Sequence, residues 1–473
     1  MISNVRILLG AALLLPFFFV SVTPLIAEVH VEALDEAYRD YDMQRRDGEG
    51  YSCATDSGAL GWSQGAIMIA YINMWEGTGN SYWLEKICEH FQRIKANAVD
   101  LEGDGYQSWY TTRYNEAIAW TDRLHNVSLA DVEPALQRIR NRQQAERATG
   151  HSYLIDFRYS GEKFRIIDWD TREIVADGLS HNGTETQVTA VEPFTFTITG
   201  ATHQGDRFLI RTKAPELSRF AVHQGRILYP VARLIEAVQR NPDLQDRFGT
   251  VAEEYLEFIN LHIFEKNERD WLEMGELGGA YRFEPKITDR FPNRIMPHNQ
   301  YAELARVWLV LKDVEGAHPL MRDRAEKMVR YFQNHLEFDA KHDAYVWRYW
   351  NWTEAGEAGS SGFESTNYAS ISTGFAAEAA RRGVVFTDED MRRFANTWLR
   401  VMWNRDEQNP MLASNVKGDG AHRFSPLTQG FVELAEWEPR IHDLAVNAFS
   451  SLDEPERIPL AHLIVLSAAR AGR

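Results

Sequence analysis

The chain has 473 residues, 44% of them hydrophobic and 25% charged, a composition typical of a globular protein with two or three domains or one large helical domain. Its formal net charge of −17 argues against nucleic-acid binding, because such proteins present a net basic face to phosphates. The 14 Trp and 18 Tyr exceed what a core needs, and flat aromatic rings often serve as stacking platforms for sugars.

The first segment, residues 1–27, contains one Arg followed by a long apolar run that ends before Glu28. A short basic start and a hydrophobic stretch are typical of a secretory signal peptide. The apolar run is also long enough to span a bilayer, so an N-terminal membrane anchor is the alternative. In both cases we expect a secreted or periplasmic protein that meets a membrane only through this segment.

Apolar residues spaced three and four apart predict amphipathic helices over most of the remaining chain. Nearly all-apolar helices alternate with helices that are apolar on one side, which predicts an inner and an outer layer. Long connections rich in Gly and aromatic residues favour a closed ring over an open solenoid. The sequence therefore predicts a mainly α protein, an (α/α) toroid or incomplete barrel of helical hairpins. The predicted helices span residues 30–46, 59–77, 81–97, 221–240, 243–266, 298–315, 319–337, 367–383, 388–404, 427–449 and 458–471.

Residues 151–215 break this pattern, because β-branched and aromatic residues alternate there with polar ones between Gly and Asn. We expect a small antiparallel β unit inserted into the toroid, with residues 28–150 and 216–473 forming the helical hairpins on either side. Insertion is tolerated where the ends of the inserted unit lie close together. A carbohydrate-binding lobe, a lid and a spacer are the alternatives for its role.

The two cysteines, Cys53 and Cys88, lie on neighbouring predicted helical segments. They are either bridged or two separate thiols, and they are too few for a cysteine metal site. The chain has no His-x-x-x-His helix, Gly-rich phosphate loop or calcium loop of standard form. We therefore expect neither a metal nor another cofactor.

Three stretches carry a resemblance to a known group of proteins: "FAVHQGRILYPVARL", "MPHNQYAELARVWLVL" and "GFESTNYASISTGFAAEAARRGVVFTDEDMRRFANTWLRVMW". Together they resemble the six-hairpin (α/α)-toroid carbohydrate-active enzymes, most of all secreted polysaccharide lyases that act on polyuronides. The resemblance covers roughly residues 50–120 and 216–450. It implies a substrate groove at one end of the ring, over the starts of the inner helices.

The segment that follows Phe363 departs from the pattern of this group. Relatives often carry Glu-Asp-x-Ser-His-Gly, whereas this chain has Glu364-Ser365-Thr366-Asn367-Tyr368-Ala369. The acid-plus-histidine pair is therefore incomplete at this position.

A cluster of polar residues directly follows Pro297, at the predicted start of an apolar helix. Cleavage of a polyuronide by β-elimination requires neutralisation of the sugar carboxylate, a base at C5 and an acid at the leaving oxygen. The cluster supplies these groups. We expect His298 or Tyr301 as base, Asn299 and Gln300 as neutralisers and Arg294 as local positive charge. The alternative is structural, with Asn299 capping the helix and Tyr301 as a core aromatic.

Further candidates lie at the starts of other predicted inner helices. His223 begins one of them and is a second candidate for a general base or carboxylate contact. Glu364 precedes a helix rich in small residues, where an acid in the first turn is an equally good interpretation. The aromatic clusters "YQSWYTTRY" and "YVWRYWNW" are candidates for sugar stacking. From these clusters we expect substrate contacts by Trp109, Tyr110, Arg113, Trp347 and Trp350.

Two other functions remain open. A glycoside hydrolase on the same toroid needs two carboxylates, with Asp104, Asp270, Glu273 and Glu364 as candidates. A noncatalytic glycan-binding protein is the other alternative. In all cases the expected partner is a polysaccharide or oligosaccharide, and for the lyase it is acidic.

Overall fold

The computed structural model describes residues 30–126, 128, 130–136, 150–189, 194–286, 288, 291–354 and 357–472. The chain divides into two units, Met1–His30 and Val31–Arg473, and all features below belong to the second. The expected signal peptide or anchor at residues 1–27 lies outside the described residues. None of the helices in the described ranges is long and apolar enough to cross a lipid bilayer.

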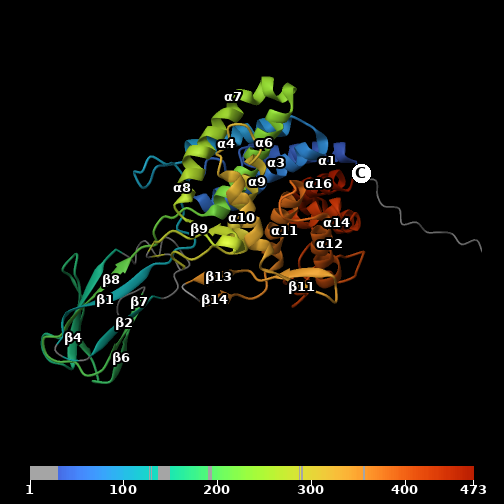
Figure 1. Cartoon of the computed structure of the whole chain (residues 1–473). Coiled ribbons are helices and arrows are strands. Elements are labelled where there is room, and N and C mark those ends of the chain that lie inside the picture. Colours follow the sequence, from blue (N-terminus) through green and yellow to red (C-terminus); the bar gives the residue numbers. More distant parts are fainter. Residues whose placement is uncertain are drawn as a thin grey trace, which may run out of the picture. The chain divides into compact units, whose positions relative to one another are not determined.

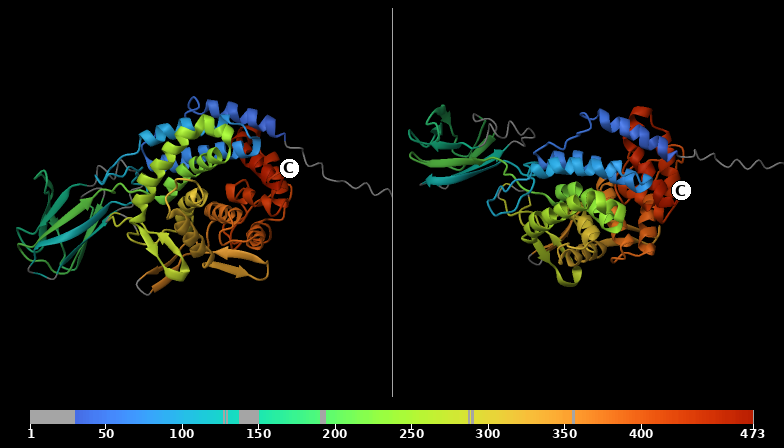
Figure 2. Two further views of the ribbon diagram at one scale, coloured as in Figure 1. Left: turned by 45° about the horizontal axis from the view of Figure 1, so that its top comes forward. Right: turned by 90° about the horizontal axis from the view of Figure 1, so that it is seen from above.

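Six helices of the described chain form a closed ring, the inner ring, in which each helix packs against the next. The ring closes because the last of these helices, α16, packs against the first, α3 (Figures 1 and 2). In order, the inner ring consists of α3 (Gly65–Thr78), α6 (Ala221–Arg240), α9 (His298–Leu311), α11 (Thr366–Arg381), α13 (Gln429–Glu433) and α16 (Ala461–Ala471).

A second set of helices, the outer helices, covers the inner ring from outside, one against each inner helix or pair of inner helices. They alternate with the inner helices along the chain, so the fold is a toroid of helical hairpins and the predicted fold class is confirmed. The outer helices are α1 (Val31–Gln44), α4 (Tyr82–Ala96), α7 (Pro242–Phe258), α10 (Met321–Gln333), α12 (Asp388–Asn396) and α14 (Arg440–Ser450).

Short elements extend or connect these helices. The helical ones include α2 (Ser57–Ala59), α8 (Glu265–Glu268), α15 (Glu454–Arg457), the 3-10 turns η3 (Gly275–Leu277), η5 (Leu434–Glu436) and η6 (Ile458–Leu460), and the π-helical turns η1 (Leu60–Gln64), η2 (Ile259–Phe264) and η4 (Thr397–Met402). Three hairpins lie in the long connections: β9 (Trp271–Glu273) with β10 (Gly279–Tyr281), β11 (Leu336–Asp339) with β12 (Ala344–Trp347), and β13 (Asn351–Glu354) with β14 (Glu357–Ser360).

Glycines let the inner helices approach one another closely. A Cβ atom on Gly225 of α6 would lie 2.2 Å from the backbone carbon of Glu303 on α9. One on Gly430 of α13 would lie 2.0 Å from the carbonyl oxygen of Ser370 on α11. Side chains at these positions would therefore push neighbouring inner helices apart.

The β unit consists of two antiparallel sheets packed face to face around their own apolar core (Figure 1). Among the described residues, one sheet has five strands in the order β1-β8-β3-β4-β5 and the other has three in the order β2-β7-β6. The strands are β1 (Ile118–His125), β2 (Asp131–Leu136), β3 (Ser152–Asp156), β4 (Lys163–Asp168), β5 (Ile174–Ser180), β6 (Glu185–Val188), β7 (Phe194–Thr199) and β8 (Arg207–Lys213).

The predicted boundary of the β unit at residue 151 is too late, because β1 and β2 already belong to its sheets. The strand β1 pairs along its length with β8, and β2 pairs with β7. The two ends of the insertion lie side by side, since Asn115 Nδ2 donates to the carbonyl oxygen of Glu216 at 2.8 Å and to Ser218 Oγ at 2.8 Å. These hydrogen bonds from Asn115 thus close the insertion at its base.

Gly225→Ala tests the close packing of the inner ring. Because the added methyl would collide with backbone atoms of α9, we expect the free energy of unfolding to fall by about 1–3 kcal/mol. Gly249→Ala on the outer helix α7 is the matched control, since its Cβ would meet only Gln245 Cγ at 3.6 Å. There the higher helix propensity of Ala should leave stability unchanged or raise it by up to about 1 kcal/mol. Equal effects of both changes in denaturant titrations would contradict the packing argument.

Candidate functional site

A cavity of about 540 Å³ lies on the axis of the inner ring, and we call it the axial cavity. Every inner helix contributes to its wall, mostly through residues in its first turns, so the N-terminal ends of these helices converge on it. Helix N-termini carry partial positive charge and unsatisfied N–H groups. The lining residues are Trp62, Ala66, Ile69, Arg113, Tyr114, Arg226, Glu303, Arg306, Asn367, Tyr368, Ser370, Ile371, Leu427, Thr428, Gln429, His462 and Leu463.

Ion pairs between inner helices form the floor of the axial cavity. The carboxylate of Glu303 accepts from Arg226 Nη1 at 2.9 Å, and Arg306 donates to Glu433 at 3.0 Å. The guanidinium of Arg306 also lies 3.9 Å from the centre of the Tyr229 ring. Glu303, Arg306, Tyr229 and Glu433 are each at most 2% exposed, so the cavity ends at this layer.

Tyr114 is one of the ionisable side chains that line the cavity, together with Tyr368, His462 and Glu303. Its hydroxyl accepts from the indole N–H of Trp62 at 2.8 Å, and it lies 3.4 Å from Nε2 of His223. On the other side of the imidazole, Nδ1 lies 3.0 Å from Ser57 Oγ. Trp62 belongs to the π-helical turn η1, and such turns are frequent at functional sites because they redirect side chains.

His223 positions Tyr114 rather than facing the cavity itself. It is buried, and burial together with Arg113 lowers the pKa of its imidazole to about 3, so the ring is neutral near pH 7. If Nδ1 accepts from Ser57, Nε2–H points at the phenol oxygen, which then accepts twice and has its own proton free to donate. In the other tautomer Nε2 accepts the phenol proton.

The pKa of Tyr114 is raised by burial, while the Trp62 hydrogen bond and Arg113 act in the opposite direction. The phenol is therefore the resting form. Ionisation during a reaction is favoured by these N–H donors and by the nearby guanidinium.

Two arginines give the cavity positive charge around Tyr114. Arg113, which directly precedes Tyr114, is exposed, and Arg226 lies over the Trp62 ring with its guanidinium carbon 5.1 Å from the ring centre. Tyr368 lines the same cavity with 41% of its surface exposed and stacks on Tyr349 with ring centres 5.4 Å apart. The lining thus combines the phenols of Tyr114 and Tyr368 with the guanidinium groups of Arg113, Arg226 and Arg306.

The predicted roles of His298, Asn299 and Tyr301 are wrong, because all three side chains are sealed inside the protein at no more than 2% exposure. Nδ1 of His298 lies 2.6 Å from the Tyr301 hydroxyl, and Nε2 lies 2.8 Å from Asn351 Oδ1. Burial lowers the pKa of His298 to about 3 and raises that of Tyr301 well above its usual range.

The structural alternative for this segment holds in part, because Tyr301 is a core aromatic at 0% exposure, whereas Asn299 does not cap the helix. The residue before α9 is Pro297, and no side chain caps this helix. The polar residues instead hold the α9 start to the neighbouring hairpins. Gln300 is half-buried and hydrogen-bonds to Tyr349, whereas the Arg294 guanidinium lies 5.9 Å from the centre of the Trp352 ring.

Glu364 and its neighbouring tryptophans form part of the core, which corrects their predicted contact with substrate. Trp347 and Trp350 are at most 6% exposed, and their indole N–H groups donate to Glu364 and to the carbonyl oxygen of Ile295. Burial raises the pKa of Glu364 from 4.5 to about 8, so this carboxyl group is protonated near pH 7.

The loop tryptophan and tyrosine predicted as stacking platforms are buried as well, which corrects their roles. Trp109 is 1% exposed and donates to the carbonyl oxygen of Ile94 at 2.8 Å, while Tyr110 is 4% exposed. Arg113, from the same predicted cluster, does line the axial cavity.

The carboxylates suggested for a hydrolase are held in ion pairs outside the cavity lining. Asp104 pairs with Lys266 at 3.0 Å, Asp270 with Arg219, and Glu273 with Lys327 at 2.8 Å. These ion pairs attach the long connections to neighbouring segments of the toroid.

Sequence reasoning selected His223 and Arg113 and missed Trp62, Tyr114, Arg226 and Glu303. One signal was available, because Arg226 follows His223 by three residues and so lies on the same helix face. Tyr114 directly follows Arg113 but was interpreted only as one aromatic of a cluster. The position of Trp62 depends on the π-helical turn, which no spacing pattern in the sequence reveals.

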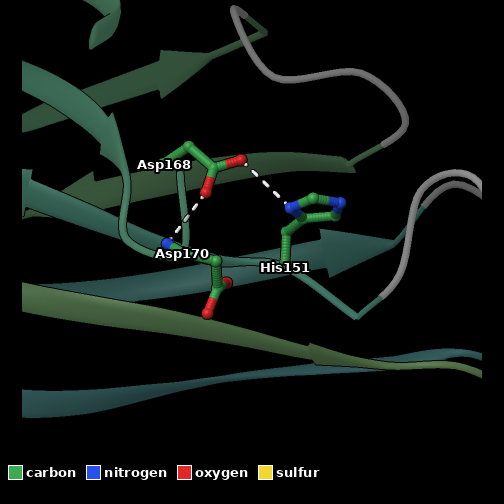
Figure 3. A group of neighbouring side chains, drawn as sticks. All are labelled: His151, Asp168 and Asp170. Atoms are coloured by element: carbon green, nitrogen blue, oxygen red, sulfur yellow. Dashed lines mark hydrogen bonds and ion pairs between the residues drawn. The ribbon is translucent and has the colours of Figure 1, made fainter. Parts of the chain in front are cut away.

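One group of side chains in the described part of the chain brings metal-ligating atoms together. Donor atoms of His151, Asp168 and Asp170 in the β unit lie within 4.8 Å of one another (Figure 3). Both carboxylates already accept backbone N–H groups, Asp168 from Asp170 and Thr171, and Asp170 from Ser152. These hydrogen bonds stabilise the turn between β4 and β5 and its contact with β3. They explain why the three side chains lie close together without a metal.

Comparisons with known proteins give weak structural likenesses and no sequence match. No family model matches the chain, and no curated protein sequence matches it. An inactive variant of the α-1,6-mannanase GH76A of Salegentibacter sp. HEL1_6, in complex with α-1,6-mannotetrose, is 10% identical at a TM-score of 0.44, covering 93% of this chain and 99% of that chain. Its complex with α-1,6-mannotriose, also an inactive variant, gives 9% identity and a TM-score of 0.40 over 93% and 97%.

A third solved structure, Xanthomonas campestris FlgL, is 11% identical at a TM-score of 0.16 over 43% of this chain and 77% of that chain. At these scores the likenesses carry no argument about fold or activity. The assignment of the fold rests on the closed contacts of the inner ring.

Glu364→Gln tests the protonated core carboxyl. Because the folded state binds this proton more tightly than the unfolded chain does, its contribution to stability is complete below pH 4.5 and is lost as the pH rises to about 8. The loss should be on the order of a few kcal/mol, and the neutral amide should remove it. Denaturant titrations at pH 4.5, 6, 7 and 8 measure the difference between the two proteins.

Glu253→Gln on the exposed face of α7 is the control and should leave the pH dependence of the wild-type protein unchanged. If the Glu364→Gln variant loses stability toward pH 8 as steeply as the wild type does, Glu364 is ionised in the folded protein and its assignment fails.

Proposed function

We propose that the protein is a carbohydrate-active enzyme that cleaves a uronate-containing saccharide by β-elimination in the axial cavity. The observation that carries this proposal is the Tyr114 hydroxyl, held between the Trp62 N–H and His223 on a wall that also bears Arg113 and Arg226.

The chemistry of β-elimination matches these groups. Removal of the C5 proton leaves an electron pair that forms the C4–C5 double bond, while the C4–O4 bond breaks and O4 takes up a proton. The C5 proton is acidic enough only if the adjacent carboxylate is neutralised, and Arg113 and Arg226 are the groups available for this. Tyr114 is the proton-transfer group: once its own proton has passed to solvent, the phenolate takes the C5 proton, and the phenol so formed passes that proton to O4, which regenerates the phenolate.

His223 and Trp62 supply the second requirement, which is a phenol that can ionise transiently. Both direct nitrogen atoms at the phenol oxygen, and hydrogen bonds to a phenolate are stronger than those to a phenol. The exposed ring of Tyr368 is a surface on which a sugar ring can stack.

Glycoside hydrolysis is the second candidate, and one feature of the cavity favours it. Of the described residues that line the cavity, Glu303 is the one with a carboxylate, and its Oε2 has no hydrogen-bond partner. A hydrolase needs a second carboxyl group within about 5–9.5 Å. Glu303 is also ion-paired with Arg226 and Arg306, so a substrate would have to displace a guanidinium to reach it.

Tyr114→Phe is the direct test. We expect turnover of a uronate oligosaccharide to fall by at least about 100-fold, because the change removes only the proton-transfer oxygen. Incubation with alginate, glucuronan, pectate and neutral mannan is followed by the ultraviolet absorbance of the unsaturated product and by reducing ends. Both signals together identify a lyase, whereas reducing ends alone identify a hydrolase and contradict the proposal.

Tyr301→Phe is the matched comparison, because it removes the hydroxyl of a buried tyrosine outside the cavity. We expect a loss of stability of about 1 kcal/mol from the broken bond to His298, with turnover retained. If Tyr301→Phe abolishes turnover in a folded protein while Tyr114→Phe does not, the chemistry belongs to the α9 start instead.

A further inference from the structure

The outward face of the five-stranded sheet in the β unit differs from the rest of this acidic chain in its charge. Residues alternate between the two faces of a strand, so the register of the strands shows which side chains share a face. Opposite to the apolar core lie the basic residues Lys163, Arg165, Arg207 and Arg211, against the two carboxylates of Asp122 and Asp156. This face is net basic in a chain of net charge −17.

The arginines are held in place by a buried carboxylate. Asp156 on β3 stands directly between Arg165 on β4 and Arg207 on β8. Its oxygens accept from Arg165 Nη2 at 2.9 Å and from Arg207 Nε at 3.2 Å, although Asp156 itself is only 1% exposed. The side chain of Arg207 remains 46% exposed, so its guanidinium is oriented and still accessible to solvent.

A second arginine of this face lies beside an exposed tryptophan. Arg211 on β8 pairs with Asp122 at 2.5 Å and is 44% exposed. Its cross-strand neighbour on the edge strand β1 is Trp120, which is 37% exposed. A uronate residue carries both a carboxylate and a sugar ring. A guanidinium can bind the carboxylate while the indole beside it contacts the ring.

The two exposed arginines are separated along the same strand. Three residues of β8 lie between Arg207 and Arg211, so the two positions are four steps apart, which is about 13 Å at about 3.3 Å per residue. A single small anion cannot contact both, whereas an extended chain with repeated carboxylates can. The charge and the spacing therefore match a linear acidic polymer.

We propose that this face, which we call the arginine face, binds an acidic polysaccharide and holds it on the enzyme while the axial cavity acts on it. The inference rests on the proposed function for the identity of the polymer, but the binding itself needs no turnover. It assigns to the β unit the part of a carbohydrate-binding lobe.

The test uses affinity electrophoresis of the full-length protein in gels that contain polygalacturonate, with carboxyl-reduced polygalacturonate as the neutral counterpart. We expect retardation by the acidic polymer alone. Arg207→Gln combined with Arg211→Gln should weaken the apparent affinity by about tenfold or more, since each change removes a charge-assisted contact. Trp120→Ala should weaken it as well.

Arg123→Gln is the matched control. Arg123 lies on the same edge strand, alternates to the other face and is 50% exposed in its pair with Asp131, so retardation should be unchanged. Thermal unfolding checks that each variant is folded, and Arg211→Gln alone decides the matter if the double variant does not fold. Equal retardation by the carboxyl-reduced polymer, or unchanged affinity of the folded arginine variants, would overturn the proposal.

Turnover of a uronate trisaccharide separates this proposal from the function of the cavity. The arginine variants should keep the kcat and KM of the wild type on the trisaccharide and show a raised KM only on the polymer. If no variant or wild-type protein turns over any uronate while retardation still depends on Arg207 and Arg211, the cavity proposal fails and the arginine face stands.

Discussion

Charge neutralisation on the axis of the inner ring is the constraint on which the rest of the structure depends. The side chains that meet there are long arginines and glutamates, and Glu303, Arg306, Glu378 and Glu433 are at most 2% exposed. A buried charge is costly unless it is paired, and removal of one partner from such a pair typically costs about 3–5 kcal/mol. The inner helices are therefore held at the rotation and height that bring opposite charges together.

This network continues away from the cavity. Arg382 bonds to both Glu236 and Glu378, and the hydroxyl of Tyr229 donates to Glu378 at 2.9 Å. These shared carboxylates and arginines fill the axis beneath the axial cavity. Closure of the ring and the location of the cavity thus have the same cause.

The cavity gains its chemistry from what the helix starts bring to it. Helix N-termini and the arginines Arg113 and Arg226 favour an anion, while Tyr114 stands where an anion would lie. Acid–base catalysis by a phenol needs support for the phenolate, and Trp62 and His223 come from two different inner segments to provide it. The site is therefore a product of ring closure, since no single hairpin contains it.

The sequence predicted the layers and hairpins of the fold well, because a closed toroid requires a regular alternation of all-apolar and one-sided helices. It selected His223 as a polar residue at the start of an inner helix, and Arg113 as a member of an aromatic cluster on a connecting loop. It failed for His298, Tyr301 and Glu364. These residues have the same local pattern, and packing against α10, α11 and the neighbouring hairpins seals them from solvent.

The start of the β unit at Ile118 was also not predicted. The stretch "IAWTDRLH" alternates as a strand does, but its outward positions carry Trp120 and Leu124 instead of polar residues, which obscures the pattern. The pairing of β1 with β8, from opposite ends of the insertion, explains why these apolar residues stand on an edge strand. Long-range pairing of this kind leaves no local signal.

A crystal structure of the Tyr114→Phe variant with a bound uronate trisaccharide would test the central claim most directly. The account predicts a sugar ring inside the axial cavity, with its carboxylate against Arg113 or Arg226 and its C5 facing the ring of residue 114. A saccharide bound elsewhere with the axial cavity empty, or one whose carboxylate points away from both arginines, would contradict it.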